Sequence, residues 1–215
     1  MLNTETVREF FDRCAPSWDA EMIRDDEKIR RILDHACVLE GVDVLDVATG
    51  TGVLIPDYLK RGVSSVTAID LSPEMIRLAR KKISDPRVRF LTGDAMTEDL
   101  GGPFDVIMIY NAFPHFGDPE GLIDRLFQHL KPGGTLSVAH GSSREEIDRH
   151  HEGSARTVSM GLMPAEDLAA LFKRRLTVAA VISDNSLYQV VGRKDRIQAS
   201  TAGALPEGTP PCGAK

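Results

Sequence analysis

The sequence predicts an α/β fold of the Rossmann-like, doubly wound kind, built on a mostly parallel seven-stranded sheet. Three observations predict it. Strand-like and helix-like segments alternate from about residue 42 onward, an apolar run at 42–47 enters the glycine-rich turn 48–52, and two late apolar runs flank a short polar turn. Such alternation is typical of parallel strands joined by crossover helices, and the last pair of runs predicts an antiparallel hairpin.

The first five strands are predicted from apolar runs, and the fourth is apolar enough on both sides of Asp105 for burial on both faces. They are predicted at Val42–Val47, Ser65–Ile69, Val88–Leu91, Phe104–Tyr110 and Thr135–Ala139. The hairpin adds Thr177–Ile182 and Leu187–Val191, which brings the number of strands to seven.

Helices are predicted between these strands, and local signals mark their ends. Ser72 can cap a helix and Pro73 suits its first turn. The run Lys131–Gly134 is a stop signal and turn. The predicted helices are Val53–Lys60, Glu74–Ile83, Pro119–Leu130, Ser143–His150 and Ala165–Lys173.

The chain divides into three parts. Residues 1–41 are helical in pattern and carry Phe10, Phe11 and Trp18, so we expect a helical cap over the ligand edge of the sheet. Residues 42–195 are the expected core of the same domain. Residues 196–215 are rich in Ala, Gly, Pro and Thr, which predicts a disordered tail.

Composition excludes several classes of function. The 215 residues carry a net charge of -6, whereas a nucleic-acid partner requires a basic face. Three scattered cysteines favour neither a disulfide framework nor a thiolate metal site. No apolar run approaches the roughly 18 residues of a membrane span, and the N-terminus lacks the apolar core of a secretory signal. We therefore expect a cytoplasmic protein. Whether it is a monomer or a homodimer is left open by the sequence.

The glycine-rich turn predicts a cofactor site. Gly50 and Gly52 allow a sharp turn and a close approach to a ligand, and the next helix offers unpaired N–H groups. A nicotinamide-binding turn reads G-x-G-x-x-G, but here Asp46 precedes the glycines and no third glycine follows at that spacing. A carboxylate at the strand end repels a pyrophosphate and attracts a cationic amino acid.

The turn Asp46–Gly52 resembles motif I of the class I S-adenosylmethionine-dependent methyltransferases. Ala48 stands where many of them have glycine, a departure shared with the menaquinone- and ubiquinone-type subgroup. Further features of the family follow in order along the chain, namely Asp70 at the end of the second strand, Gly93–Ala95 after the third, Tyr110–Pro114 after the fourth and Leu130–Gly134 before the fifth.

The resemblance implies a cofactor and the residues that bind it. The cofactor is S-adenosylmethionine, and the product S-adenosylhomocysteine. The loop after the first strand should hold the methionine part, Asp70 the ribose, and Asp94 the adenine, with Leu71 and Met75 packed on the ring. The full expected cofactor-binding set is Asp46, Ala48, Thr49, Gly50, Gly52, Asp70, Leu71, Met75, Asp94, Ala95 and Asn111.

Histidines gather after the fourth and fifth strands, where the acceptor should meet the methyl group. His115, His140 and His151 are the catalytic candidates, because neutral imidazole can act as a general base. A structural hydrogen bond at a strand end explains His140 equally well. Converging imidazoles could instead hold a transition metal, and the sequence leaves that hypothesis open.

The predicted function is transfer of a methyl group from S-adenosylmethionine to a small-molecule acceptor by in-line displacement, which is an activity of class EC 2.1.1. Two alternatives remain, an NAD-dependent oxidoreductase and a non-catalytic protein that binds S-adenosylmethionine or a metal. The acceptor atom is open among oxygen, sulfur, nitrogen and carbon.

Overall fold

One sheet of seven strands organises the molecule. The computed structural model describes residues 2–151 and 156–196, and among these the strand order is β3-β2-β1-β4-β5-β7-β6. The strands are β1 Asp43–Val47, β2 Ser65–Asp70, β3 Val88–Thr92, β4 Phe104–Tyr110, β5 Leu130–His140, β6 Thr177–Ser183 and β7 Tyr188–Arg193. β7 lies between β5 and β6 and is antiparallel to both, while the first five strands pair in parallel. The predicted α/β fold is confirmed.

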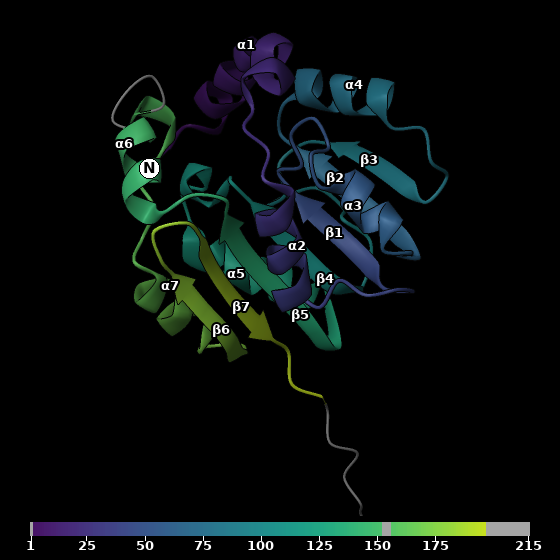
Figure 1. Ribbon diagram of the computed structural model, residues 1–215, viewed down its shortest axis with the longest axis vertical. Helices are drawn as coiled ribbons and strands as arrows, with labels where there is room; N and C mark the ends of the chain where they lie inside the picture. Colours follow the sequence, from purple (N-terminus) through teal and green to yellow (C-terminus); the bar gives the residue numbers. More distant parts are fainter. Residues whose placement is uncertain (1, 152–155, 197–215) are drawn as a thin grey trace, which may run out of the picture.

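Helices cover both faces of the sheet (Figure 1). They are α1 Thr4–Glu21, α2 Asp26–His35, α3 Ile55–Lys60, α4 Pro73–Lys82, α5 Pro119–Gln128, α6 Arg144–His151 and α7 Ala165–Phe172, with short 3-10 turns η1 Phe113–His115 and η2 Arg156–Val158. The predicted start of α4 is confirmed, since the Ser72 side chain accepts a hydrogen bond from the Met75 N–H and Pro73 is its first residue.

The largest difference from the predicted boundaries lies between α5 and β5. The helix ends at Gln128, because the His129 carbonyl accepts a hydrogen bond from the Phe104 N–H. Leu130 then pairs with Phe104, and regular pairing resumes at Thr135 after a register shift. The predicted turn 131–134 is thus an irregularity inside a longer strand, which begins before Thr135.

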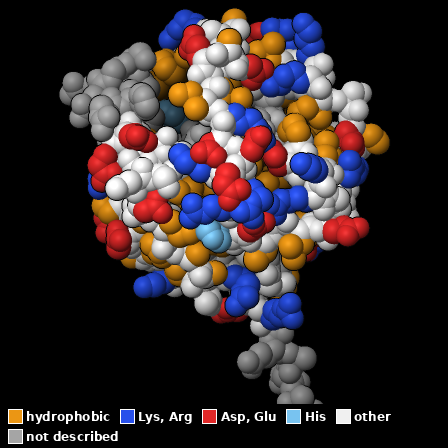
Figure 2. Space-filling model, in the orientation of Figure 1, with side chains coloured by type: hydrophobic (Ala, Val, Ile, Leu, Met, Phe, Trp, Pro, Cys, Tyr) orange, Lys and Arg blue, Asp and Glu red, His pale blue; other side chains and the backbone are white. Residues whose placement is uncertain are grey.

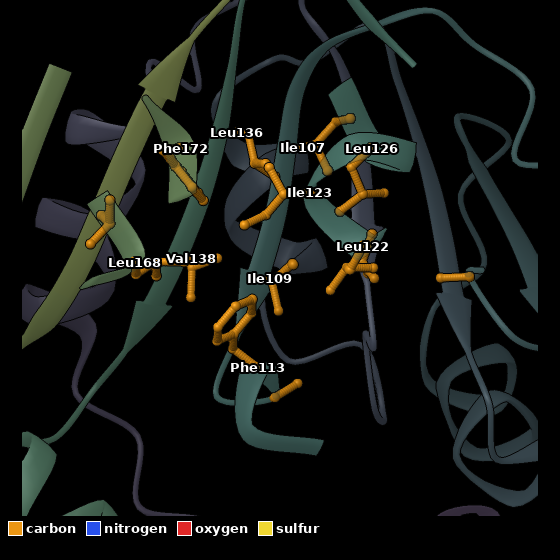
Figure 3. Packing of buried hydrophobic residues seen from close by; sticks show 14 of the residues in the cluster. Ile107, Ile109, Phe113, Leu122, Ile123, Leu126, Leu136, Val138, Leu168 and Phe172 are labelled. Atoms are coloured by element: carbon orange, nitrogen blue, oxygen red, sulfur yellow. The ribbon is translucent and has the colours of Figure 1, made fainter. Parts of the chain in front are cut away.

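Two hydrophobic layers explain why the central strands are mostly apolar. Along β4, Ile107 and Ile109 face α5 and α7, where they pack with Leu126, Leu136 and Phe172 (Figure 3). The alternate residues of β4 belong to the opposite layer under α2, α3 and α4.

The two N-terminal helices occupy different places. α2 packs on the sheet, and its Ile32 carbonyl accepts a hydrogen bond of 3.0 Å from Gln189 Nε2. α1 lies instead across the end of the molecule toward which β1 points (Figure 1). Polar contacts hold it there, because Asp12 accepts from Ser72 Oγ at 2.5 Å and Asp19 from Lys82 Nζ at 2.7 Å.

The surface offers no broad area of one sign on the face shown in Figure 2, where basic and acidic side chains are interspersed. The basic residues at the end of α4 follow this pattern, since Arg77 pairs with Glu74 and Lys82 with Asp19. Within the described ranges, no helix combines the length and apolar character that crossing a bilayer requires.

Candidate functional site

A cavity of about 510 Å³ opens where β1, β2, β3 and β4 end. It lies at the switch point of the sheet, since the chain winds outward from β1 in one direction and from β4 in the other. Its volume is within the roughly 300–1,000 Å³ of small-molecule sites. Strand-end residues in its wall are Ala48, Thr49, Gly50, Asp70, Leu71, Gly93, Asp94, Ala95, Met96, Tyr110, Asn111 and Ala112.

The loop after β1 runs along the cavity with two residues in an unusual backbone conformation. Ala48 and Gly50 have φ values of 56° and 57°, in the left-handed region. The Thr49 N–H donates to the Ile69 carbonyl at 3.0 Å, which fixes the loop against β2. Ala48, Thr49 and Gly50 line the cavity as the cofactor prediction requires.

Asp70 joins this loop to the end of β2. Its Oδ2 accepts from the Gly50 N–H at 2.7 Å and its Oδ1 from the Ser72 N–H at 2.9 Å. The side chain is 8% exposed, and burial raises its pKa to about 6, against the two backbone hydrogen bonds. Each carboxylate oxygen keeps a further lone pair, so Asp70 can accept two hydroxyl groups from a ligand.

Asp46 lies behind the loop and outside the cavity wall. It is 2% exposed, and its carboxylate accepts from Thr49 Oγ1 at 2.6 Å and from the Tyr58 hydroxyl at 3.1 Å. Burial raises its pKa to about 7, although both hydrogen bonds oppose the rise. In this structure Asp46 shapes the loop through Thr49, so any effect on a ligand passes through the backbone of residues 48–50.

The buried Asp46 predicts a pH dependence of stability. Because its pKa is raised on folding, the protonated form stabilises the folded state at low pH, and this contribution is lost as pH rises from about 4 to about 7. Over this range the free energy of unfolding of wild type should fall relative to Asp46→Asn by about 1–3 kcal/mol. Denaturant titration at several pH values measures it.

Asp43→Asn is the matched control for that profile. Lys131 and Ser65 hydrogen-bond to the Asp43 carboxylate and lower its pKa, so its contribution to stability is lost as pH falls. The two variants should therefore deviate from wild type in opposite directions along the pH axis. Parallel curves for wild type and Asp46→Asn would contradict this account of Asp46.

Gly52 also lies outside the cavity wall, where the loop packs on α3 and α4. Its φ is 80°, and a Cβ added there would lie 2.7 Å from Ile83 Cδ1 and 3.1 Å from Ile55 Cδ1. Glycine is therefore required at this position by the backbone and by close packing. Any contribution of Gly52 to cofactor binding would be indirect, through the turn that joins the loop to α3.

Gly52→Ala should lower the free energy of unfolding by about 2–4 kcal/mol, from the left-handed backbone and the crowded Cβ together. Gly41→Ala is the matched control, since Gly41 has the same φ of 80° but no atom within 4 Å of an added Cβ. It should cost about 1–2 kcal/mol, the backbone part alone. Equal losses in urea titrations would show that crowding at Gly52 is unimportant.

The remaining predicted cofactor residues lie together on the far side of Asp70. Leu71 and the buried Met75 line the cavity, as do Asp94 and Ala95. The Asp94 carboxylate accepts from the Met96 N–H at 2.9 Å, which turns the chain after β3. Met75 is both core and cavity wall.

Asn111 closes the wall beside β4. Its φ is 54°, and its side-chain oxygen accepts from the Gly141 N–H at 2.9 Å. This bond ties the end of β4 to the residue that follows β5. Asn111 also lines the cavity, as the cofactor prediction requires.

The structure separates the three candidate histidines. His115 in η1 lines the cavity, where its ring meets Phe11 edge-on at 4.9 Å. His140 is 2% exposed at the end of β5, opposite Tyr188, and is not part of the cavity wall. His151 is the last residue of α6, and its side chain lies outside the described atoms.

A hydrogen bond fixes the orientation of the His115 ring. Nδ1 lies 2.7 Å from the Val158 carbonyl oxygen, which can only accept. Nδ1 therefore carries a proton. As for a metal, the described side chains contain no group of three His, Cys, Asp or Glu that could hold one.

Several wall residues were not predicted from the sequence. Met22, Ile23 and Arg24 follow α1 and line the cavity, with Arg24 donating to the Val53 carbonyl at 2.8 Å and to Asp57 at 2.7 Å. They fall within residues 1–41, which were predicted as helical, but the structure places them between α1 and α2. Trp18 was predicted to cover this edge, and its Nε1 lies 3.8 Å from the position of a Cβ on Gly50.

Comparison with known proteins identifies the same region. A family model described as "Methyltransferase domain" matches residues 44–134. The chain is 30% identical over 142 residues to the malonyl-[acyl-carrier protein] O-methyltransferase of Acetivibrio thermocellus, covering 65% of this chain and 50% of that protein. It is 38% identical over 105 residues to the ubiquinone biosynthesis O-methyltransferase of Xylella fastidiosa, covering 47% and 42%. The chain thus spans about half the length of the curated relatives it matches.

Solved structures share the fold. The N-methyltransferase NodS from Bradyrhizobium japonicum, in complex with S-adenosyl-L-homocysteine, superposes with a TM-score of 0.66 at 16% identity, covering 87% of this chain and 98% of NodS. A structure described as the DhpI–SAH complex gives 0.67 at 18% identity, covering 89% and 97%. At 16% and 18% sequence identity, these superpositions show a shared fold and nothing more specific.

Proposed function

We propose that this chain, which carries a methyltransferase domain of the class I, S-adenosylmethionine-dependent family, transfers a methyl group from that cofactor to a small molecule. The observation that carries the proposal is Asp70, a nearly buried carboxylate held by two backbone N–H groups at the switch point of the sheet. The catalytic part is residues 42–195, with α1 as its cover.

The residues present fit this cofactor. Asp70 would accept both ribose hydroxyls, and Asp94 would accept from the adenine amino group. Leu71 and Met75 would pack on the ring. The backbone of residues 48–50 would hold the methionine part, with Asp46 behind it. When bound, S-adenosylmethionine supplies an activated methyl group, so the protein contributes alignment and exclusion of water.

His115 is the proposed general base. It lines the same cavity as Asp70, and its hydrogen bond to the Val158 carbonyl fixes the orientation of the ring. Burial outside the cavity wall favours a structural role for His140, which pairs with Tyr188 between β5 and β7. We further propose that His151, the last residue of α6, lies near the acceptor.

The names of the two relatives indicate different acceptors. One is a malonyl-[acyl-carrier protein] O-methyltransferase, and the other is an O-methyltransferase of ubiquinone biosynthesis. We take the acceptor here to be a small molecule, since the cavity holds about 510 Å³ and most of its wall is apolar. The cofactor would fill much of this volume.

Titration calorimetry with S-adenosylhomocysteine and with NADH tests the proposal. We expect one site per chain for S-adenosylhomocysteine, with a dissociation constant of about 1 μM to 1 mM, and no binding of NADH. Radiolabel transfer from S-adenosylmethionine to a panel of small acceptors then tests turnover. Binding of NADH alone would overturn the proposal in favour of an oxidoreductase, and full cofactor affinity without transfer would favour a non-catalytic binding protein.

A further inference from the structure

Helix α1 is fastened to the two loops that line the cavity after β1 and β2, and it lies next to α4 there (Figure 1). Near the middle of α1, Asp12 accepts from Ser72 Oγ at 2.5 Å and from the Glu74 N–H at 3.3 Å. About two turns later, Asp19 accepts from Thr51 Oγ1 at 2.5 Å. The first contact therefore lies at the end of β2, and the second lies in the loop after β1.

Ser72 connects Asp12 to the carboxylate of Asp70. Its hydroxyl donates to Asp12, while its N–H donates to Asp70 Oδ1 at 2.9 Å. Its oxygen also accepts from the Met75 N–H at 3.1 Å, and the residue is 0% exposed. A buried serine with each of these groups engaged has little freedom to shift. Asp12 therefore helps to set the position of the N–H that Asp70 accepts.

The orientation of the Asp70 carboxylate matters most for the ribose. Its two oxygens accept from different neighbours, Oδ2 from the Gly50 N–H and Oδ1 from the Ser72 N–H. These two bonds set the directions of the lone pairs that remain, and hydrogen bonds weaken steeply when they are misaligned. A shift of Ser72 would therefore weaken acceptance from the ribose hydroxyls more than it would affect the adenine or the methionine part.

We propose that Asp12 is a positioning residue of the cofactor site, and that α1 takes part in recognition of the ribose. It does so by holding Ser72, and through Ser72 the carboxylate of Asp70. This rests on the proposed function, in which Asp70 accepts both ribose hydroxyls. Docking of α1 and binding of a ribose with both hydroxyls then favour each other, because coupling between two sites is reciprocal. A ligand without the two hydroxyls gains nothing from Asp12.

Titration calorimetry on the full chain tests this with two ligands, S-adenosylhomocysteine and its 2′,3′-dideoxy analogue. Asp12→Ala should weaken binding of S-adenosylhomocysteine about 5- to 10-fold and binding of the analogue by less than about twofold. Asp12→Asn keeps an oxygen that can accept from Ser72, so its affinity for S-adenosylhomocysteine should stay within about threefold of wild type. Equal losses for the two ligands in Asp12→Ala would mean that Asp12 only anchors α1, and would overturn the inference, as would no loss for either.

Asp19→Ala is the matched control, because Asp19 also anchors α1 but by another route. It accepts from Thr51 and, at 2.7 Å, from Lys82 Nζ, and within the described ranges neither partner hydrogen-bonds to Asp70. Its replacement should weaken binding of the two ligands by the same factor. A loss confined to S-adenosylhomocysteine, as large as that in Asp12→Ala, would contradict the route through Ser72.

A double variant tests the connection itself. Ser72→Ala removes the same hydrogen bond from the other end, along with a cap of α4. In that background, Asp12→Ala should weaken binding of S-adenosylhomocysteine by less than about a further twofold, because the link is already broken. Losses that multiply in Ser72→Ala/Asp12→Ala would show that the two side chains act independently, which contradicts the inference.

The outcomes separate the two levels of the proposal. If wild type does not bind S-adenosylhomocysteine, the proposed function fails. If wild type binds it no more tightly than the dideoxy analogue, the ribose assignment of Asp70 fails together with this inference. If wild type prefers S-adenosylhomocysteine and Asp12→Ala keeps the full preference, only the inference about Asp12 fails.

Discussion

Replacing Asp70 with asparagine is expected to weaken binding of S-adenosylhomocysteine by about 2–3 kcal/mol, or about 30- to 150-fold. The carboxylate accepts from the Gly50 and Ser72 N–H groups at 2.7 and 2.9 Å and would accept both ribose hydroxyls as well. Asparagine replaces one acceptor oxygen with a donor, so it loses a backbone contact of the loop and a ligand contact together. Titration calorimetry gives the change directly.

The pH dependence of the same measurement adds a second readout. Burial raises the pKa of Asp70 to about 6, so in the free protein the carboxylate gains a proton as pH falls through that value. Affinity of wild type for S-adenosylhomocysteine should therefore decline below about pH 6, whereas Asp70→Asn should lack that component. Asp43→Asn, at the opposite end of the sheet, should leave affinity within about threefold of wild type. Unchanged affinity of Asp70→Asn would remove the ribose assignment.

Replacing His115 with glutamine is expected to lower kcat by about 10²–10⁴-fold, the usual contribution of a general base. Affinity for S-adenosylhomocysteine should change little, because the imidazole lines the acceptor part of the cavity beside Phe11. The limb of the wild-type pH–rate profile that reports the base should vanish in the variant. Single-turnover transfer from S-adenosylmethionine measures the loss.

His129→Gln is the matched control for this variant. His129 also has its Nδ1 against a backbone carbonyl, 2.9 Å from the Gly101 oxygen, but it lies outside the cavity wall. Its replacement should leave kcat within about threefold of wild type. Equal losses in the two variants would mean that His115 acts through folding, and unchanged kcat in His115→Gln would place the base elsewhere.

Much of the fold follows from local signals in the sequence. Phe104–Tyr110 is a strand with the predicted bounds, because the residues on either side of Asp105 are apolar enough for the hydrophobic clusters on both faces. Ser72 and Pro73 define the start of α4 through capping and a fixed φ, which act within one turn. The start of β5 was not predicted, since Leu130 pairs with Phe104, a residue far away in the sequence.

The positions of site residues were predictable where the residues directly follow the end of a parallel strand. Gly50, Asp70 and Asp94 line one cavity because parallel strands bring their carboxyl ends to one edge. Their contacts with a cofactor stay predictions. The separation of His115 from His140 was not predictable, because both follow apolar strands and only the pairing of β7 with β5 encloses His140. The position of α1 depends on pairs such as Asp12 with Ser72, which lie 60 residues apart.

A crystal structure of the chain with S-adenosylhomocysteine tests the central claim most directly. The account predicts the ligand in the cavity at the ends of β1, β2 and β4, with both ribose hydroxyls hydrogen-bonded to Asp70 and the sulfur facing the part of the cavity that holds His115. A ligand bound outside this cavity, or inside it with the ribose away from Asp70, would contradict the account.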